Sequence, residues 1–384
     1  MTLARTDFES NAAADELISG GVELSGFRMP AEWEPHEATW IGWPHNRIDW
    51  PGKFSAIAWV YGEIVRKIAA GEIVRIIVES KAHEHSALRV LGKVGVDLSR
   101  IEFFRFATDR GWTRDMGPLF VKNDATGEIA IVRFRFNAWA KYPDWHNDRK
   151  TPKRAAEALG VQLIRAVVPR IGKKTRRDDF VLEGGAIDVN GRGTLISTEE
   201  CLLDQEIQPR NPGVEFHHVE SRLMAYFGVK NLIWLAKGIE GDDTHGHVDD
   251  VCRFTGPRTI VLCEEKNPND YNYRILSENR ERLEGAQLED GSKPEVVRLP
   301  MPEPLFFEAR RLPASYANFY VCNAAVLVPT FNDPADRVAL GILSELITDR
   351  PVVGIHAVDL VWGLGTLHCL TQQQPGTGSE GATR

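Results

Sequence analysis

The sequence predicts an α/β protein in which one supersecondary unit, strand–strand–helix–strand, recurs along the chain. Pairs of short apolar runs separated by a turn begin near residues 119, 186, 248 and 318, so the repeat is about 67, 62 and 70 residues long. Each pair precedes a segment with helical periodicity and then one more apolar run. The chain has 384 residues, of which 43% are hydrophobic and 26% charged, as in a globular protein with a sizeable core. A repeat this regular indicates similar units packed against one another.

The segment before the first pair predicts a strand, a helix and a further strand. Residues 29–44 are rich in tryptophan and end in a strand closed by Pro44. Residues 54–68 carry apolar side chains at a 3.6-residue period, which is typical of a helix with one buried face. The other segments expected here are a buried strand over 73–78, a helix near 82–92 and a strand over 101–106.

Four cycles of the repeated unit are expected after this segment. Each begins with two strands joined by a turn, such as Asn190-Gly191 in the second cycle, and continues with a helix and a strand. In order, the expected segments are 119–121, 129–136, 152–159 and 161–168; 186–189, 194–197, 216–227 and 231–235; 248–254, 259–263, 270–285 and 296–299; and 318–321, 326–328, 335–347 and 352–355.

The chain contains no segment with the composition of a linker, so one domain is expected. Residues 1–28 are predicted to be a flexible N-terminal arm, and residues 376–384, rich in Gly, Ser and Thr, a disordered tail. The single catalytic domain then spans residues 29–375.

Charge and cysteine usage exclude several classes of protein. The net charge is −8, and the richest basic run, 173–177, is followed directly by Asp178 and Asp179, which argues against nucleic-acid binding. No apolar run approaches the roughly 18 residues of a membrane span, and the acidic N-terminus does not resemble a signal peptide. Five cysteines form no CxxC pattern, so we expect reduced thiols and a cytosolic location.

One cysteine near the C-terminus lies in a composition typical of active sites. Gly363 and Gly365 precede Cys369, and Thr371 with three glutamines, 372–374, follows it. Most free cysteines are inert buried side chains, but such a cysteine needs neither flanking glycines nor a polar run. The amides are better suited to fixing a polar ligand than to filling a core. Cys369 is therefore a candidate nucleophile.

Further chemically distinctive residues occupy the same place in each cycle, just before or at the start of the strand pair. Any one of them could be an ordinary turn carboxylate or a buried histidine, but their shared phase is hard to explain by chance. Units wrapped around an axis would bring these positions together in one polar pocket. The residues are Asp115, Glu183, His247, Asp249, Asn318 and Cys369.

These segments together resemble the agmatine deiminase and bacterial peptidylarginine deiminase family, within the guanidino-group-modifying superfamily. The similar stretches are Met29-Pro30-Ala31-Glu32-Trp33-Glu34-Pro35-His36, Trp112-Thr113-Arg114-Asp115-Met116-Gly117-Pro118, Leu182-Glu183-Gly184-Gly185, Gly246-His247-Val248-Asp249, Ser315-Tyr316-Ala317-Asn318-Phe319-Tyr320 and His368-Cys369-Leu370-Thr371-Gln372-Gln373-Gln374-Pro375. The resemblance covers about residues 29–375. It implies the pentein fold, an α/β-propeller of five ββαβ units around a pseudo-fivefold axis.

The resemblance also implies roles for individual residues. Cys369 would be the nucleophile, His247 the general acid and base, and Asp115 with Asp249 the carboxylates that bind the guanidinium. No metal and no organic cofactor is expected. A metal site formed by His245, His247 and Asp249 is the alternative, but alternate residues of a strand point to one face and do not surround an ion. The residues expected to contact the substrate are Trp112, Glu183, Asp243, Asn318, Gly365 and Trp43.

The chemistry of a guanidinium asks for the same residue types independently. This planar cation offers a fixed set of N–H donors, so carboxylates are its natural partners. Attack on its central carbon needs a strong nucleophile, and a free cysteine is only about 3% thiolate at pH 7. Two buried aspartates oppose ionisation of Cys369, although a protonated His247 would reverse this. We therefore favour activation of the thiol by the substrate's own charge.

The group beyond the guanidinium is inferred from the expected mouth of the pocket. We expect Arg110 and Arg114 to be the only cations nearby, with Arg114 held in a structural ion pair. An acidic, aromatic mouth would favour agmatine, which deimination converts to N-carbamoylputrescine and ammonia, over arginine. The alternatives are a deiminase of free or peptidyl arginine or of another small guanidino compound, an amidinotransferase and an inactive binding protein. Whether the chain forms a homo-oligomer stays open. The residues expected to line the mouth are Trp43, Asp49, Trp112, Asp242, Asp243 and Trp362.

Overall fold

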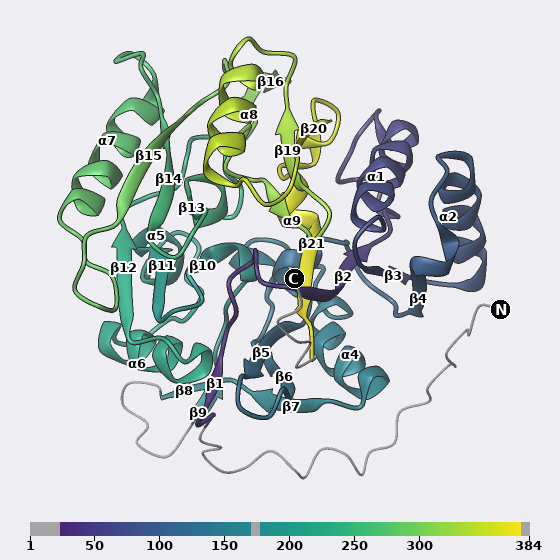
Figure 1. Cartoon of the computed structure of the whole chain (residues 1–384), viewed down its shortest axis with the longest axis horizontal. Helices are drawn as coiled ribbons and strands as arrows, with labels where there is room; N and C mark the ends of the chain where they lie inside the picture. Colours follow the sequence, from purple (N-terminus) through teal and green to yellow (C-terminus); the bar gives the residue numbers. More distant parts are fainter. Residues whose placement is uncertain (1–23, 170–176, 378–384) are drawn as a thin grey trace.

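The computed structural model of the chain describes residues 24–169 and 177–377 (Figure 1). Most of the predicted arm (1–28), of the predicted tail (376–384) and of the basic run 173–177 lies outside these residues. The described part of the arm ends in β1 (Phe27–Arg28), which pairs antiparallel with β5 (Leu119–Asn123). No helix within the described ranges is long and apolar enough to cross a lipid bilayer.

Five sheets of the described chain share one strand pattern, which confirms the predicted strand–strand–helix–strand cycle. In each, the first strand is antiparallel to the second and the second is parallel to the third. The sheets are separate, and none of them closes into a barrel within the described residues. They comprise β5, β6 (Ile129–Arg133) and β7 (Gln162–Arg165); β10 (Ile187–Val189), β11 (Thr194–Thr198) and β12 (Asn231–Leu235); β13 (Cys252–Phe254), β14 (Thr259–Glu264) and β15 (Glu295–Pro300); β18 (Tyr320–Val321), β19 (Val326–Thr330) and β20 (Val352–His356); and β21 (Thr371–Pro375), β2 (His36–Gly42) and β3 (Ile73–Val78).

A helix connects the two parallel strands of each sheet and packs on the outside of the molecule (Figure 1). Parallel strands need such a crossover, and its inner face must be apolar. In α1 (Phe54–Ile68), for example, Ile57, Ile64 and Ile68 are buried at helical spacing. The other crossover helices are α4 (Thr151–Leu159), α6 (Phe216–Phe227), α7 (Tyr271–Glu284) and α8 (Ala335–Leu346).

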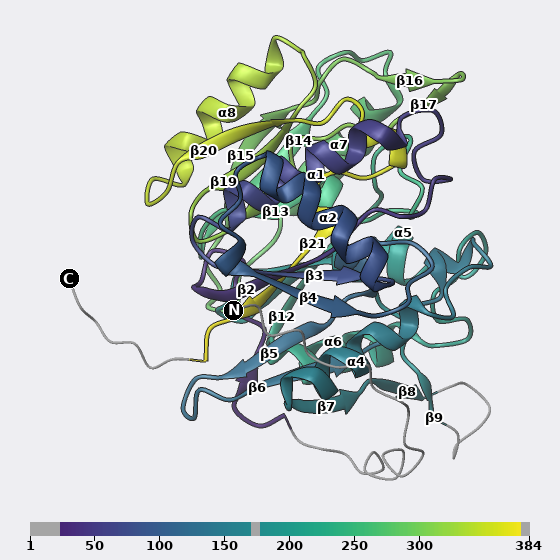
Figure 2. The same ribbon diagram turned by 90° about the vertical axis from the view of Figure 1, so that its right-hand side faces the viewer.

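The first sheet carries a second crossover. β4 (Ile101–Arg105) is added parallel to β3, and α2 (Lys81–Lys93) lies beside α1 on the same face of the sheet (Figure 2). Ser80 caps α2, because its side chain accepts a hydrogen bond from the backbone N–H of His83.

The last strand of the chain pairs with the first long one, which the sequence did not predict. Residues 361–375 were expected to form a loop whose glutamines fix a ligand, whereas β21 runs antiparallel to β2. The Gln374 carbonyl accepts a hydrogen bond of 2.9 Å from the Trp40 indole, and that of Gln373 accepts one of 2.8 Å from Arg114. The ligand-binding expectation was therefore wrong for these two amides, which satisfy buried donors inside the fold.

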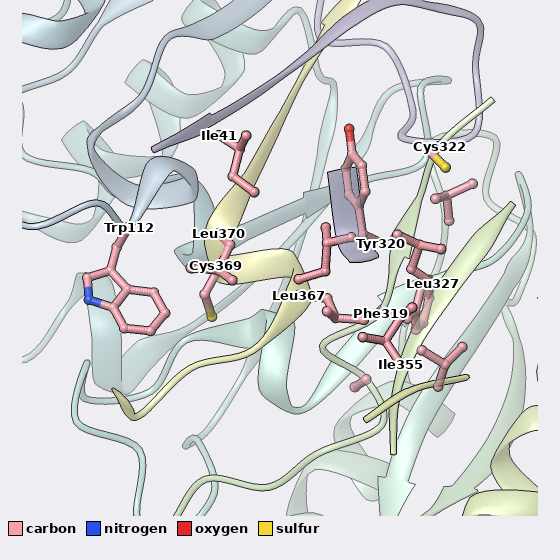
Figure 3. Packing of buried hydrophobic residues seen from close by; sticks show 14 of the residues in the cluster. Ile41, Trp112, Phe319, Tyr320, Cys322, Leu327, Ile355, Leu367, Cys369 and Leu370 are labelled. Carbon is pink, nitrogen blue, oxygen red and sulfur yellow. The ribbon is translucent and has the colours of Figure 1, made fainter. Parts of the chain in front are cut away.

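Several short elements complete the described chain. Residues 361–370 contain two helical turns, and Figure 3 shows Leu367 directed into the cluster around Phe319 and Leu327 while Cys369 lies on the side of Trp112. The short helices are α3 (Thr113–Met116), α5 (Glu199–Leu202), α9 (Leu367–Leu370) and the 3₁₀ turns η2 (Leu98–Arg100), η3 (Ala138–Ala140), η4 (Asp148–Lys150), η5 (Gly184–Ala186), η6 (Val248–Asp250) and η7 (Val361–Gly363). The short strands are β8 (Val167–Pro169) with β9 (Arg177–Asp179) and β16 (Phe306–Phe307) with β17 (Arg310–Arg311).

Candidate active site

Short turns directly before the first strand of each sheet carry the candidate residues. The sequence placed these residues at the start of the strand pairs, and the structure adds that most of them lie on, or next to, a single helical turn. Such a turn ends where its strand begins, which fixes its side chains relative to the sheet. Asp115 lies on α3, Glu183 precedes η5, His247 precedes η6, Asp249 lies on η6, Asn318 precedes β18 and Cys369 lies on α9.

The Cys369 thiol is buried and has two polar neighbours. Its sulfur lies 3.2 Å from the Asn318 amide nitrogen and 3.8 Å from Oδ2 of Asp249. The Asn318 carbonyl in turn accepts hydrogen bonds from the Thr366 hydroxyl (2.7 Å) and the backbone N–H of His368 (3.1 Å). Asn318, expected to bind substrate, thus holds the cysteine-bearing turn in position.

The surroundings of Cys369 keep the thiol protonated. Burial raises its pKa well above the usual range, and the nearby acidic side chains, with Asp249 making the largest contribution, raise it further. The hydrogen bond from Asn318 opposes this shift without reversing it. Without a bound cation, the candidate nucleophile is therefore a neutral thiol.

Both carboxylate oxygens of Asp115 accept hydrogen bonds from fixed donors. Oδ2 accepts one of 2.9 Å from the Trp139 indole, and Oδ1 accepts one of 3.1 Å from the backbone N–H of Gly185. A Cβ at Gly185 would lie only 2.5 Å from Nδ1 of His247 and 2.9 Å from Oδ1 of Asp115, so only glycine lets these groups approach. Burial raises the pKa of Asp115 to about 6.

Asp249 belongs to a buried chain of charged groups that the sequence did not reveal. Nδ1 of His368 lies 2.6 Å from Oδ2 of Asp249, and its Nε2 lies 2.8 Å from Oε2 of Glu32. Burial raises the pKa of Asp249, but the hydrogen bond from His368 and its charge hold it below the usual value. Oδ1 has no hydrogen-bond partner among the described residues, so one oxygen is available to a ligand. The only sequence signal was the position of His368 beside Cys369.

His247 lies between the carboxylates. Its Nδ1 is 3.8 Å from Asp115 and 4.0 Å from Asp249, and its Nε2 is 3.9 Å from Oε2 of Glu183. Burial lowers the pKa of the imidazole, but the charge of Asp115, with contributions from Glu183 and Cys201, raises it well above the usual value. The ring is therefore protonated in the free protein and can donate a proton to a departing group.

Glu183 has a structural partner that the sequence did not suggest. Nε of Arg210 lies 2.9 Å from Oε1 of Glu183, and both side chains are fully buried. Burial raises the pKa of Glu183, but Arg210 and His247 lower it below the usual value, so the group is a carboxylate. Its role is to face His247, and it does not line the cavity described next.

A cavity of about 190 Å³ leads from the surface to Cys369 and Asp115. Its walls are aromatic and carry paired charges. The aromatic residues are Trp112, Trp139, Tyr142, Phe307 and Trp362, and the charged ones near the mouth are Asp49, Arg110, Asp243 and Arg310. Gly365 packs against two residues that line it, because an added Cβ would lie 2.8 Å from the Trp112 ring and 3.2 Å from the Cys369 sulfur.

The charges at this mouth are balanced, whereas an acidic mouth was expected. Asp243 accepts hydrogen bonds of 2.5 Å from both Tyr142 and Arg310, and Lys141 also contacts it. Arg110 pairs with Asp49 at 2.8 Å. The expectation that Arg110 and Arg114 are the only cations nearby was wrong, because Arg310 and Lys141 also lie at the mouth. Arg310 comes from the β16–β17 hairpin and Lys141 from the turn after η3. Both segments are far in sequence from the other segments of the mouth, so the sequence did not reveal them.

Three further expectations about the mouth have definite outcomes. Trp43 is buried in the core, where its ring packs edge-on against Tyr61 at 6.0 Å, and it does not line the cavity. Asp242 accepts hydrogen bonds from the backbone N–H groups of the turn before His247, so its role is structural. Arg114 forms the expected structural ion pair, at 3.2 Å from Glu32.

Two other places in the molecule lack the features of an active site. A larger groove of about 600 Å³ lies between α7 and β14, but its one cysteine, Cys263, is hydrogen-bonded to Ser315, and no histidine lines it. The alternative metal site is also not formed, because His245 lies 2.7 Å from Asp204.

We expect kcat/KM to fall on the acid side with an apparent pKa of about 6. The reason is that protonation of Asp115 removes a charge that attracts the guanidinium, which does not itself titrate in this range. Replacing Trp139 with Phe removes a hydrogen bond to the Asp115 carboxylate that is worth about 0.5–1.5 kcal/mol. The acid limb of the pH profile, where kcat/KM falls, should therefore move to higher pH by about half a pH unit to one pH unit. The measurement is the pH profile of both proteins.

Trp362→Phe is the matched control for this pH profile. Trp362 lines the same cavity, but its indole donates to the backbone carbonyl of Pro51 and not to Asp115. Its acid limb should therefore coincide with that of the wild type. An unchanged limb in Trp139→Phe would mean that another group, and not Asp115, controls the acid side.

Comparison with known proteins relates this site to a family. Residues 28–375 match the Porphyromonas-type peptidyl-arginine deiminase family. The agmatine deiminase of Pseudomonas aeruginosa is 34% identical over 91% of this chain and 96% of its own length. The solved agmatine deiminase of Enterococcus faecalis superposes with a TM-score of 0.83 at 30% identity, covering 93% of this chain and 98% of that one. A substrate-bound C. jejuni agmatine deiminase gives a TM-score of 0.79 at 28% identity, over 91% and 96% of the two chains.

Proposed function

The chain belongs to the Porphyromonas-type peptidyl-arginine deiminase family, and from this we propose that it is a hydrolytic deiminase acting on agmatine. The observation that carries the proposal is the buried cluster of Cys369, His247, Asp115 and Asp249, in which Cys369 and Asp115 line the cavity. Agmatine would give N-carbamoylputrescine and ammonia. The relatives named agmatine deiminases support this choice of substrate over other guanidino compounds.

The finer architecture is also a proposal. We infer that the five sheets surround one pseudo-fivefold axis as the units of an α/β-propeller, with the active site near that axis. The pairing of β21 with β2 supports this arrangement, because it joins the end of the chain to its beginning and so completes the fifth sheet. The second support is that candidate residues from the turns before all five sheets lie next to one another around Cys369 and His247.

Binding would place the guanidinium between Asp115 and Asp249. The Asp249 oxygen without a partner is free to accept an N–H, while Asp115 is held by Trp139 and Gly185. A unit positive charge about 4 Å from the thiol is worth roughly 4 kcal/mol at an effective dielectric of 20, or about three pKa units. The substrate would therefore offset the effect of the carboxylates on Cys369 and allow the thiol to lose its proton to solvent, since His247 already carries one.

The reaction then follows in two stages. The Cys369 thiolate attacks the guanidinium carbon, and His247 donates its proton to the departing nitrogen, so that a carbon–nitrogen bond breaks and ammonia leaves. A covalent S-alkylthiouronium remains on Cys369. His247, now neutral, accepts a proton from a water molecule that attacks the same carbon. The carbon–sulfur bond breaks, which releases the ureido product and regenerates the cysteine.

Substrate-assisted activation predicts how Cys369 reacts with two similar reagents. At pH 7, chloroacetamidine, which carries the amidinium charge, should inactivate the protein at least about 100-fold faster than the neutral chloroacetamide, because only the cation can lower the thiol pKa. The measurement is the second-order inactivation rate, with mass spectrometry to locate the adduct on Cys369. Equal rates would instead indicate a preformed thiolate. The absence of any adduct would favour the inactive binding protein.

For agmatine itself, we expect kcat/KM at least about 100-fold higher than for arginine, a difference of roughly 2.7 kcal/mol. Asp243 would receive the distal ammonium, because its carboxylate is buried whereas its cationic partners Lys141 and Arg310 are partly exposed and can turn to solvent. A steady-state assay of ureido product and of ammonia measures the ratio. Ammonia release without an added amine also separates a deiminase from an amidinotransferase.

Butylguanidine, which lacks the ammonium, isolates the contribution of Asp243. Asp243→Asn should lower kcat/KM for agmatine by about tenfold or more and leave that for butylguanidine within about twofold. Equal losses for the two substrates would show that Asp243 supports the cavity walls and does not bind the amine.

Free arginine is the second candidate substrate, and one observation favours it. Arg310 is half-exposed beside Asp243, so an amino acid could bind its carboxylate to Arg310 and its ammonium to Asp243. Under this alternative, Arg310→Ala would reduce activity on arginine selectively. If agmatine is the substrate, the same variant should retain or improve activity on agmatine.

A further inference from the structure

Three side chains behind the proposed catalytic cavity have the composition of a metal site. Glu183, Cys201 and His247 each offer one ligand atom, and these atoms all lie within 4.8 Å of one another. All three residues are fully buried. Cys201 is the one member of the group that has no part in the proposed deiminase mechanism.

Two of the three ligand atoms have no competing hydrogen bond. Oε2 of Glu183 and Nε2 of His247 have no hydrogen-bond partner among the described residues, and they lie 3.9 Å apart. The other oxygen of Glu183 is held by Arg210, so Oε2 has a fixed position. Buried polar atoms without partners are rare in proteins, and coordination of a metal ion is one way in which such atoms are satisfied.

The backbone that carries the group is held by several contacts. The Thr198 side chain accepts a hydrogen bond of 3.1 Å from the backbone N–H of Cys201, which caps α5. The same hydroxyl donates to the backbone carbonyl of Gly246, directly before His247. Cys201 and His247 are thus tied to each other through one threonine, which gives the preorganised geometry that a metal site requires.

We propose that Glu183, Cys201 and His247 form a binding site for a thiophilic divalent cation such as Zn²⁺, and that its occupation inhibits the protein. Zinc takes thiolate, imidazole and carboxylate ligands at about 2.0–2.3 Å in tetrahedral sites, which places ligand atoms roughly 3.3–3.8 Å apart. The 3.9 Å separation of Nε2 and Oε2 is close to this. The cation would bind Nε2 of neutral His247 and the thiolate of Cys201, so that the imidazolium proton and the thiol proton are both released to solvent. The inhibitory consequence, but not the binding itself, rests on the proposed role of His247.

Co²⁺ absorption tests the binding separately from activity. Co²⁺ is added to the full-length protein and incubated to equilibrium, because the ligands are buried. Wild type and the catalytically silenced Cys369→Ala should both show a thiolate-to-cobalt charge-transfer band, and Cys201→Ala and Cys201→Ser should both lack it. A band that persists without Cys201 and disappears without Cys369 would overturn the proposal, since the metal would then bind the nucleophile. The absence of any band in the wild type would overturn it as well.

Inhibition by Zn²⁺ tests the consequence. Half-inhibition should require at least about tenfold more Zn²⁺ in Cys201→Ser than in the wild type, because a hydroxyl is a poor ligand for a thiophilic metal. Cys322→Ala is the matched control, since Cys322 is also a buried free thiol but lies in the turn between β18 and β19, hydrogen-bonded to the backbone of Ala325. Equal sensitivity of Cys201→Ser and wild type would overturn the inhibitory role, even if the cobalt band shows that the site binds metal.

Discussion

Cys369→Ala is expected to abolish turnover, leaving less than about 1% of the wild-type rate. Loss of a covalent nucleophile normally costs orders of magnitude, and no other described cysteine lines the cavity. The variant should still fold, because the substitution removes a single buried sulfur, at a cost of about 1 kcal/mol. The measurements are ammonia release, the thermal unfolding midpoint and calorimetric binding of agmatine.

Agmatine binding separates a chemical defect from a structural one. Asp115 and Asp249 remain in Cys369→Ala, so the variant should still bind the guanidinium while failing to convert it. Residual activity above about 1% would contradict covalent catalysis through this residue. Cys322→Ala removes a buried thiol that does not line the cavity, so this variant should keep most of its activity. Its unfolding midpoint shows how much stability is lost with a buried sulfur alone.

Asp249→Asn is expected to lower kcat/KM by about 30- to 5,000-fold, corresponding to the roughly 2–5 kcal/mol lost when one partner of a buried charge pair is truncated. The amide oxygen of the new side chain can take the place of Oδ2 of Asp249, which lies 2.6 Å from Nδ1 of His368. Its NH₂ group then replaces the oxygen that has no partner and faces the donors of the guanidinium. The measurement is steady-state kinetics with agmatine, together with its dissociation constant.

Asp250→Asn is the matched control in the same turn. Burial, with Asp249 and Asp242 nearby, raises the pKa of Asp250 well above the usual range, which favours the protonated carboxylic acid. An amide is nearly isosteric with that acid and can still accept the hydrogen bond from Asn318. We expect a loss of less than about tenfold. Equal losses at Asp249 and Asp250 would mean that the whole turn, and not the Asp249 charge, is needed.

The repeated unit was predictable because its signals are local. Helical periodicity in residues such as Ile57 and Ile64, and the apolar strand runs, depend on neighbours a few residues away. Asp115, His247 and Cys369 were predictable as well, because each occupies the same position in its own cycle of the repeat. The short turns that carry them were not predicted, because one helical turn is too short to show a period.

The partners of the site residues were not predictable, because they lie far away in the sequence. His368 joins Asp249 to Glu32 across 336 residues, and Arg210 faces Glu183 from a loop 27 residues on. The polar run 372–374 illustrates the limit most directly. Its composition indicated a ligand site, but its amides pair with Trp40 and Arg114, which only the pairing of β21 with β2 brings near.

The sequence by itself therefore determined the repeated α/β unit and the kinds of chemical group that meet at the site, because periodicity and phase are properties of the chain. Only the tertiary structure decided how those groups are tuned. The thiol of Cys369 is neutral, Asp115 titrates near pH 6 and the mouth is charge-balanced because of burial and of contacts between distant segments. A pKa and a local potential depend on distances and desolvation in three dimensions, and no order of residues along the chain contains them.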